Sequence, residues 1–177
     1  MECSALWCEE KYCIMKTGIV RRVVPYAGPI LLCLALGALA SWLQQEALET
    51  WYPYLRKSPL TPPGYVFPVA WTLLYVLIGL AFGAVWHAEA KGAGTRGRRL
   101  LVLWSVQCLL NFLWSVCFFF GRMPWTGLGV IVLLLVSVGG FLCLAWRHSR
   151  WAFGCFVPYL LWLAFAAYLN LYVCLYN

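Results

Sequence analysis

The sequence predicts an all-α integral membrane protein, built as a bundle of five transmembrane helices. Of its 177 residues, 64% are hydrophobic and only 11% are charged. A soluble domain of this length leaves too much of its surface in water to carry that composition. The apolar residues gather in five runs of about 20 residues, long enough to cross a hydrocarbon core of roughly 30 Å. Because backbone groups in lipid must pair within their own segment, each run is predicted to be a helix.

The five predicted helices form one transmembrane domain over residues 23–177, preceded by a polar, cysteine-containing tail over residues 1–22. The tail lacks an apolar core followed by a small-residue cleavage site, so we expect no cleaved signal peptide. The longest connection, residues 44–65, joins the first two helices. The predicted spans are about 23–43, 66–87, 100–120, 125–146 and 151–172.

The connection between the first two helices is predicted to be a stiffened loop with aromatic residues at its front. Its prolines, Pro53, Pro59, Pro62 and Pro63, each fix φ and remove a backbone donor, which argues against a helix there. Long loops inside compact domains are usually functional or disordered, and this one is rich in prolines and aromatics. Two interpretations stay open: a lid over a binding site, or a rigid connector with an interfacial aromatic anchor.

The positive charges predict the orientation of the bundle. The net charge is +7, from 13 Lys and Arg residues. Ten of them fall in the tail and in the second and fourth connections, whereas Arg56, Lys57 and Arg122 fall on the opposite side. The positive-inside rule therefore places the N-terminus in the cytoplasm and the proline-rich loop and the C-terminus outside. The charges lie between apolar runs and form no basic stripe, so nucleic acid is not an expected partner.

Small residues mark where helices can approach closely. Gly79 and Gly83 form a GxxxG motif in the second helix, and Gly37 and Ser41 form a similar pair in the first. Such a motif serves either a helix contact within one chain or a dimer interface. We expect the contact within the chain, because five helices already need close interfaces.

Several kinds of chemistry are disfavoured. The sequence contains no Asp, and Glu46, Glu49 and Glu89 lie at the edges of the spans, which argues against a proton relay and against a Ser–His–Asp triad. His87 and His148 both fall at the predicted inner boundary. Neither is therefore expected to ligate a haem iron in a pocket near the outer side.

The cysteines give little sign of a metal site. Six of the nine lie inside apolar runs, where a thiol packs as a small hydrophobic group. Cys3, Cys8 and Cys13 recur every five residues in the tail, without CxxC spacing and without a nearby His. Zinc is only weakly indicated there, and we expect no metal.

Polar and aromatic residues within the spans predict a cavity. At a rise of about 1.5 Å per residue, Trp71, Asn111 and Trp162 lie at similar depth beneath the proline-rich loop. An aromatic, apolar cavity with one or two amides suits a flat hydrophobic ligand. The alternative for Asn111 and Asn170 is that they only hold the helices together by hydrogen bonds. One face of the third helix carries Gln107, Asn111, Trp114 and Phe118, and the fifth helix carries Trp162, Phe165, Ala166 and Leu169.

Six other tryptophans lie near predicted helix ends, where indoles commonly anchor a protein at the membrane interface. This aromatic belt is predicted to contain Trp42, Trp86, Trp104, Trp125, Trp146 and Trp151.

Four stretches resemble the TspO/translocator protein family, also called the peripheral benzodiazepine receptor or tryptophan-rich sensory protein family. They are WYPYLRKSPLTPPG, VAWTLLY, QCLLNFLW and PYLLWLAFAAYLN, and the resemblance runs from Pro25 to the C-terminus. It implies a five-helix membrane bundle that binds porphyrins and benzodiazepine-type ligands under its first loop and commonly forms homodimers. It implies no required cofactor, since porphyrin would be the ligand.

The resemblance also implies roles for individual residues. Trp71 and Trp162 match two tryptophans that have been linked in bacterial members to light-dependent breakdown of protoporphyrin, so the resemblance implies that they are a redox-active pair and the catalytic residues. Together, the pattern and the resemblance predict these ligand-binding residues: Trp51, Tyr52, Pro62, Pro63, Trp71, Tyr75, Gln107, Asn111, Trp114, Phe118, Trp162, Phe165 and Ala166.

Two departures from the family pattern stand out. The family usually has Pro directly after the loop lysine, whereas here Ser58 precedes Pro59, so the loop is expected to bend differently. No Lys or Arg follows Arg150, so the cholesterol motif of animal members is absent. The short C-terminus and the missing motif predict a bacterial, or at least a non-animal, member in the cell membrane.

The predicted function is a membrane receptor or sensor for tetrapyrroles, with possible photo-oxidative turnover. The alternative is a transporter of tetrapyrroles or other lipophilic molecules, and a third is a structural assembly module with a solid aromatic core. The expected partners are a planar lipophilic ligand, the lipid bilayer and a second copy of the chain.

Overall fold

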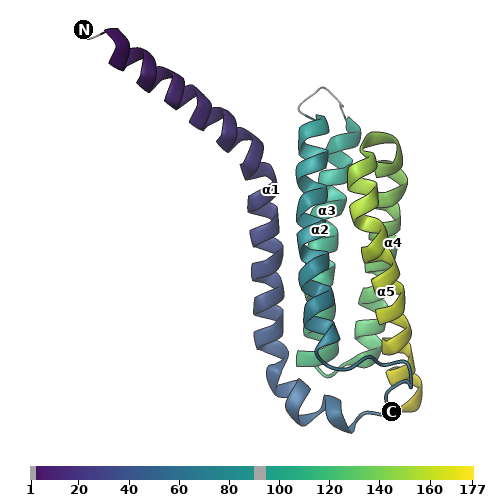
Figure 1. The fold of residues 1–177 in the computed structure, drawn as a ribbon. Helices are drawn as coiled ribbons and strands as arrows, with labels where there is room; N and C mark the ends of the chain where they lie inside the picture. The colour runs from purple at the N-terminus through teal and green to yellow at the C-terminus, as the bar shows by residue number, and fades with distance from the viewer. Residues whose placement is uncertain (1–2, 90–94) are drawn as a thin grey trace.

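The computed structural model describes residues 3–89 and 95–177, with side chains from residue 23 onward. In these ranges it contains five α-helices and no strand, which confirms the predicted all-α bundle (Figure 1). The first connection includes a 3₁₀ turn, and a π-helical turn follows the third helix. The elements are α1 (Cys3–Thr50), η1 (Tyr52–Tyr54), α2 (Val66–Glu89), α3 (Thr95–Ser115), η2 (Val116–Phe120), α4 (Pro124–His148) and α5 (Arg150–Tyr176).

The helices extend beyond the predicted spans, most clearly at α1. The predicted loop 44–65 is too long, because α1 continues to Thr50 and leaves only residues 51–65 as the connection. The segment QQEALE between them consists of good helix formers, so the helix has no reason to stop where the apolar run stops. At its other end α1 starts at Cys3, within the predicted tail. The possible zinc ligands Cys3, Cys8 and Cys13 lie outside the residues whose side chains are described.

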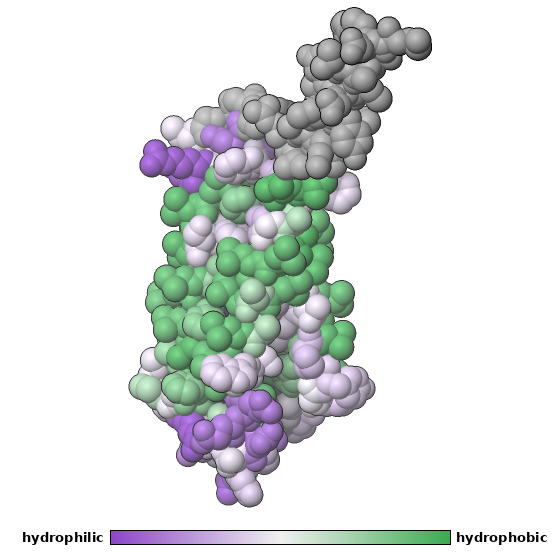
Figure 2. All heavy atoms as spheres, turned by 90° about the vertical axis from the view of Figure 1, so that its left-hand side faces the viewer, coloured by the Kyte–Doolittle hydropathy of each residue, from purple (hydrophilic) through white to green (hydrophobic). Residues whose placement is uncertain are grey.

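The helices α2 to α5 pack as a four-helix group, with α1 alongside it (Figure 1). In this group α2 and α4 each contact both α3 and α5, whereas α1 packs against α2 and against η2. All five helices are long and apolar enough to cross a membrane. A broad apolar band covers the face seen in Figure 2, with hydrophilic side chains at both ends. The chain is therefore a multi-pass integral membrane protein.

The predicted GxxxG motif is a contact within the chain, between α1 and α2. A Cβ added to Gly79 would lie 2.6 Å from the backbone nitrogen of Ile30, and one added to Gly83 would overlap the ring of Tyr26. Only glycine permits this approach of the two backbones. This contact fixes α1 beside α2 and so determines where the rest of α1 runs.

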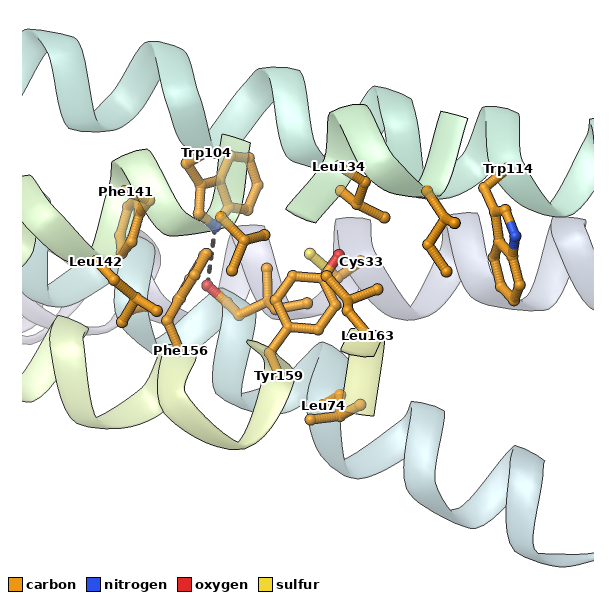
Figure 3. Close-up of a cluster of buried hydrophobic side chains, with 14 of the residues drawn as sticks. Cys33, Leu74, Trp104, Trp114, Leu134, Phe141, Leu142, Phe156, Tyr159 and Leu163 are labelled. Atoms are coloured by element: carbon orange, nitrogen blue, oxygen red, sulfur yellow. Dashed lines mark hydrogen bonds between the residues drawn. The ribbon is translucent and has the colours of Figure 1, made fainter. Parts of the chain in front are cut away.

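The half of the bundle away from the first connection is solidly packed. Phe141 and Phe156, both fully buried, stack with ring centroids 3.9 Å apart. Trp104 is also in this core: its indole is 5% exposed and donates a 2.9 Å hydrogen bond to the carbonyl oxygen of Ile78 (Figure 3). Its assignment to the aromatic belt is wrong, because α3 begins at Thr95 and Trp104 lies more than two turns inside it. The other predicted belt residues are exposed, from 48% to 82%.

Candidate ligand-binding site

A cavity of about 760 Å³ lies in the half of the bundle next to the first connection. Its walls come from α1, α2, the end of α3 with η2, α5, and the loop 51–65, whereas α4 contributes no lining residue. The volume falls within the roughly 300–1,000 Å³ typical of sites for small ligands and cofactors. The lining is mainly apolar and aromatic, with a few hydroxyl and amide groups.

Trp71, on the second turn of α2, is the centre of the aromatic wall. Its ring lies 5.7 Å from that of Tyr75 in a stacked arrangement and 5.9 Å from that of Trp114. It also meets Trp162 edge to face at 6.3 Å and Tyr159 at 6.5 Å. Offset and edge-to-face contacts of this kind are the favourable geometries for aromatic side chains. Residues from three helices are thus joined through one indole.

Asn111 connects this wall to the bundle by hydrogen bonds. Its side-chain oxygen accepts from the hydroxyl of Tyr75 at 3.3 Å, and its amide nitrogen donates to the hydroxyl of Tyr159 at 2.9 Å. Asn111 is 6% exposed, and it lines the cavity. Asn111 therefore joins α2, α3 and α5 by hydrogen bonds and also lines the cavity.

Asn170 repeats this pattern nearer to the loop. Its oxygen accepts a 3.2 Å hydrogen bond from the indole of Trp114, and its nitrogen donates to the carbonyl of Pro124 at 2.9 Å. The residue is 1% exposed and lines the cavity. Because the start of α4 is held by this bond, α4 supports the cavity without facing it.

The π-helical turn η2 brings two consecutive phenylalanines to the cavity. Gly121 donates its N–H to the carbonyl of Val116 at 2.7 Å, the wider i to i+5 spacing of a π-helix. Phe118 and Phe119 both line the cavity. They pack against the loop aromatics: Trp51 lies 5.9 Å from Phe118, and Tyr52 lies 5.6 Å from Phe119.

The loop 51–65 is tied across the cavity to α5. The hydroxyl of Ser58, 5% exposed, lies 2.8 Å from the hydroxyl of Tyr168 and accepts from the N–H of Leu60 at 3.1 Å. Arg56 exchanges two backbone hydrogen bonds with the side chain of Asn177, at 2.8 and 3.2 Å. The serine that departs from the family pattern is thus a fixed point of the loop.

The phenol of Tyr52 is a neutral group of the cavity wall. Burial raises its pKa above the ordinary value, because desolvation penalises the phenolate. The ammonium of Lys57 lies over the same ring, 4.8 Å from its centroid, within the range of a cation–π interaction. Both residues line the cavity, so the ammonium of Lys57 gives the loop side of the cavity one positive charge.

The structure brings most of the predicted site residues to this one cavity. Those that line it are Tyr52, Pro62, Trp71, Tyr75, Asn111, Trp114, Phe118 and Ala166.

Five predicted site residues do not line the cavity. Trp162 lies behind Trp71, with its indole N–H buried and unpartnered, and Phe165 packs on Trp162 at 5.9 Å. Trp51 lies behind Phe118. Gln107 is fully buried and borders a separate void of about 10 Å³, on the side away from the loop. Pro63 is exposed in the loop.

The α1 wall of the cavity was not predicted. It presents small and polar groups along one side of the helix, and the amide oxygen of Gln44 accepts a 2.9 Å hydrogen bond from the hydroxyl of Ser115. The pair of small residues Gly37 and Ser41 was the available signal, since both line the cavity. The lining residues of α1 are Leu34, Gly37, Ala38, Ala40, Ser41, Gln44 and Leu48.

The two histidines lie away from this cavity. The Nδ1 atom of His87 donates a 3.0 Å hydrogen bond to the carbonyl oxygen of Gly83, and the imidazole stacks on Tyr26 at 5.1 Å. His148 ends α4 at the opposite end of the bundle. The two imidazoles therefore do not contribute to the cavity wall.

The fold and the site together define a multi-pass helical membrane protein with a ligand-sized aromatic cavity beneath a proline-rich loop. The profile of the TspO/MBR family matches residues 29–176, and the chain belongs to that family. The tryptophan-rich protein TspO of Archaeoglobus fulgidus is 34% identical over 155 residues, 88% of this chain and 98% of that protein.

Other relatives come from bacteria and mammals. The tryptophan-rich sensory protein of Cereibacter sphaeroides is 35% identical, over 69% of this chain and 73% of that protein. The translocator protein of Ovis aries is 35% identical, over 68% of this chain and 70% of that protein. Because relatives occur in such different organisms, the bacterial origin stays a prediction. The orientation of the termini in the membrane also stays a prediction.

Proposed function

We propose that this protein is a membrane receptor or sensor that binds planar tetrapyrroles, such as protoporphyrin IX, and benzodiazepine-type lipophilic ligands. The observation that carries the proposal is the cavity of about 760 Å³, which has Trp71, Tyr75 and Trp114 on its walls and a tied loop across it. A macrocycle entering it replaces water and lipid with aromatic faces. Membership of a family with members named for sensing adds support.

The polar groups of the cavity suit the edge of such a ligand. The ammonium of Lys57 and the hydroxyl groups of Ser58 and Thr61 lie at the loop end, whereas the deep end is aromatic. A tetrapyrrole with carboxylate substituents would place its ring among the indoles and its carboxylates near Lys57. This orientation needs no metal ligand from the protein.

The extent of the cavity favours a receptor over a transporter. Its deepest lining residues include Leu34, Tyr75 and Asn111. Beyond them come the void of about 10 Å³ beside Gln107 and then the solid core around Trp104. A transport path would require polar groups or broken helices through the full depth of the membrane. The relatives named translocator protein keep transport as the alternative to test.

Titration of the purified protein with protoporphyrin IX, followed by quenching of tryptophan fluorescence, tests the proposal. We expect saturable quenching. Ala166→Phe should weaken it by roughly tenfold or more, because the added ring would occupy cavity space that the ligand needs, at an overpacking cost of about 1–3 kcal/mol. Ala164 is the matched control, because it is exposed on the same helix and does not line the cavity.

The outcomes separate binding from non-specific partitioning. Quenching that fails to saturate, or that Ala166→Phe and Ala164→Phe weaken equally, would overturn the proposed site. Saturable binding together with protein-dependent movement of porphyrin across sealed vesicles would establish the transporter instead.

A further inference from the structure

The end of the bundle opposite the cavity carries a cluster of arginines. Arg96 and Arg99 lie at the start of α3, and Arg147 lies in the last turn of α4, followed by His148. All three arginines are exposed. Together with neighbouring residues they line a recess of about 510 Å³.

An apolar groove continues from this recess. It has a volume of about 590 Å³, and it shares Arg96, Leu144 and Arg147 with the recess. The two spaces are therefore neighbours that meet at the same guanidinium groups. The remaining lining residues of the groove are Leu142, Cys143, Trp146 and Phe153.

In the described part of the chain, no carboxylate forms a salt bridge with the arginines that line the recess. The salt bridge that the described residues do form joins Arg122 to Glu46, at the end of the bundle that holds the cavity. Glu89 ends α2, and its carboxylate lies against Gly97 of α3, but it forms no salt bridge among the described residues and does not line the recess. The Nε2 atom of His148 is buried and has no hydrogen-bond partner among the described residues. The exposed guanidinium groups are thus available to an anion.

The depth of the two spaces matches a lipid. The apolar span of α4 ends at Ala145, so Leu142 and Leu144 lie within it and Arg147 lies just beyond. Trp146 marks the boundary: its ring packs edge to face on Phe153 at 4.9 Å, and the guanidinium of Arg150 lies 3.6 Å from its centroid. Indoles prefer the level of the lipid headgroups.

We propose that this end of the protein is a binding site for an anionic phospholipid. The headgroup phosphate would bind Arg96, Arg99 and Arg147, and one acyl chain would occupy the groove along Leu142 and Leu144. Guanidinium groups bind phosphate through paired, charge-assisted hydrogen bonds, and basic pockets between transmembrane helices recognise anionic lipids. By the positive-inside rule this is the cytoplasmic leaflet. A soluble phosphate would use the recess but would leave the groove unfilled.

Native mass spectrometry of the full chain tests this site. The chain is incubated in detergent with dioleoyl phosphatidylglycerol or dioleoyl phosphatidylcholine and is then released from the detergent in the spectrometer. We expect retained phosphatidylglycerol in preference to phosphatidylcholine. The double substitution Arg96→Gln and Arg147→Gln should lower the phosphatidylglycerol affinity by roughly 30-fold, taking the interaction of each arginine with an anionic surface as about a factor of five.

Arg56→Gln with Arg98→Gln is the matched control, because it removes the same charge at positions that line neither space. The thermal midpoint and protoporphyrin binding of each variant report whether the fold is intact. Equal loss in both double variants would reduce the site to general electrostatic attraction and overturn the proposal. So would equal retention of the two lipids, or displacement of phosphatidylglycerol by glycerol phosphate alone, which would identify a site for soluble phosphate.

Discussion

The two halves of this bundle use the same kinds of residues for opposite purposes. In the half away from the loop, Phe141, Phe156 and Trp104 fill the space between helices completely. In the half beneath the loop, Trp71 and Trp114 stand around a cavity of about 760 Å³. We call these the solid half and the hollow half. In the solid half α1 packs closely on Gly79 and Gly83 of α2, whereas in the hollow half small residues of α1 and the π-helical turn η2 line the cavity.

Polar side chains keep the hollow half from collapsing. Asn111 and Asn170 hold Tyr75, Tyr159 and Trp114 by hydrogen bonds. Hydrogen bonds are directional, so they fix rings at a spacing that packing alone would close. The solid half needs few such bonds, because van der Waals contact between helices already positions its side chains.

The largest expected effect tests whether the two halves differ in stability. Phe156→Ala removes a fully buried ring from the solid half and should lower the free energy of unfolding by about 3–5 kcal/mol. Phe119→Ala removes the same ring from the cavity wall, where it only enlarges an existing space, and should cost much less. Thermal unfolding in detergent measures both. Equal losses would mean that the cavity wall is as tightly packed as the core.

The second effect concerns the tryptophans of the hollow half. If an excited porphyrin takes an electron from Trp71, Trp162 can reduce the oxidised indole, since its ring lies 6.3 Å away, and dissolved dioxygen is the oxidant that then attacks the porphyrin radical. Trp71→Phe and Trp162→Phe keep most of the apolar contact but remove the easier electron donor. Light-dependent loss of porphyrin absorbance should therefore fall severalfold in each, while affinity changes little.

Trp125→Phe is the control for this experiment, since Trp125 is 63% exposed and does not line the cavity. Loss of porphyrin at the parent rate in both Trp71→Phe and Trp162→Phe would rule out the photo-oxidative activity. The protein would then act as a receptor alone.

The sequence predicted the spans and most of the hollow half, but it did not predict which helix closes it. Apolar runs mark the spans because lipid accepts only apolar helices. Trp71 and Asn111 were expected to lie close together because the number of residues between each one and the end of its helix gives its depth in the membrane. Gln107 lies one turn from Asn111, about 6 Å along the helix axis, and this step separates a buried core residue from one that lines the cavity. Depth alone does not resolve such a step.

The α1 wall and Trp104 could not be read from periodicity. The cavity side of α1 consists mostly of small or apolar residues, with Ser41 and Gln44 as its polar groups, so its polarity differs too little from that of the lipid side to give an amphipathic pattern. The position of Trp104 depends on where α3 begins, and the apolar run gave a start five residues late. Helix ends are set by local capping and connections, which the apolar pattern does not record.

The smallest expected effect concerns the loop that separates the hollow half from solvent. Ser58 and Arg56 already tie its first part to α5 and the C-terminus, so only the part around Pro62 is free to respond. Pro62→Gly with Pro63→Gly raises the entropy of the unbound loop by about 0.4–1 kcal/mol per proline, so protoporphyrin affinity should fall by a few-fold per site. Pro53→Gly is the control, because Pro53 is exposed in η1 and does not line the cavity. Fluorescence titration measures the affinities, and circular dichroism checks that helical content is kept. If the double variant binds as tightly as the parent, residues 51–65 are a connector, and the aromatic walls alone hold the ligand.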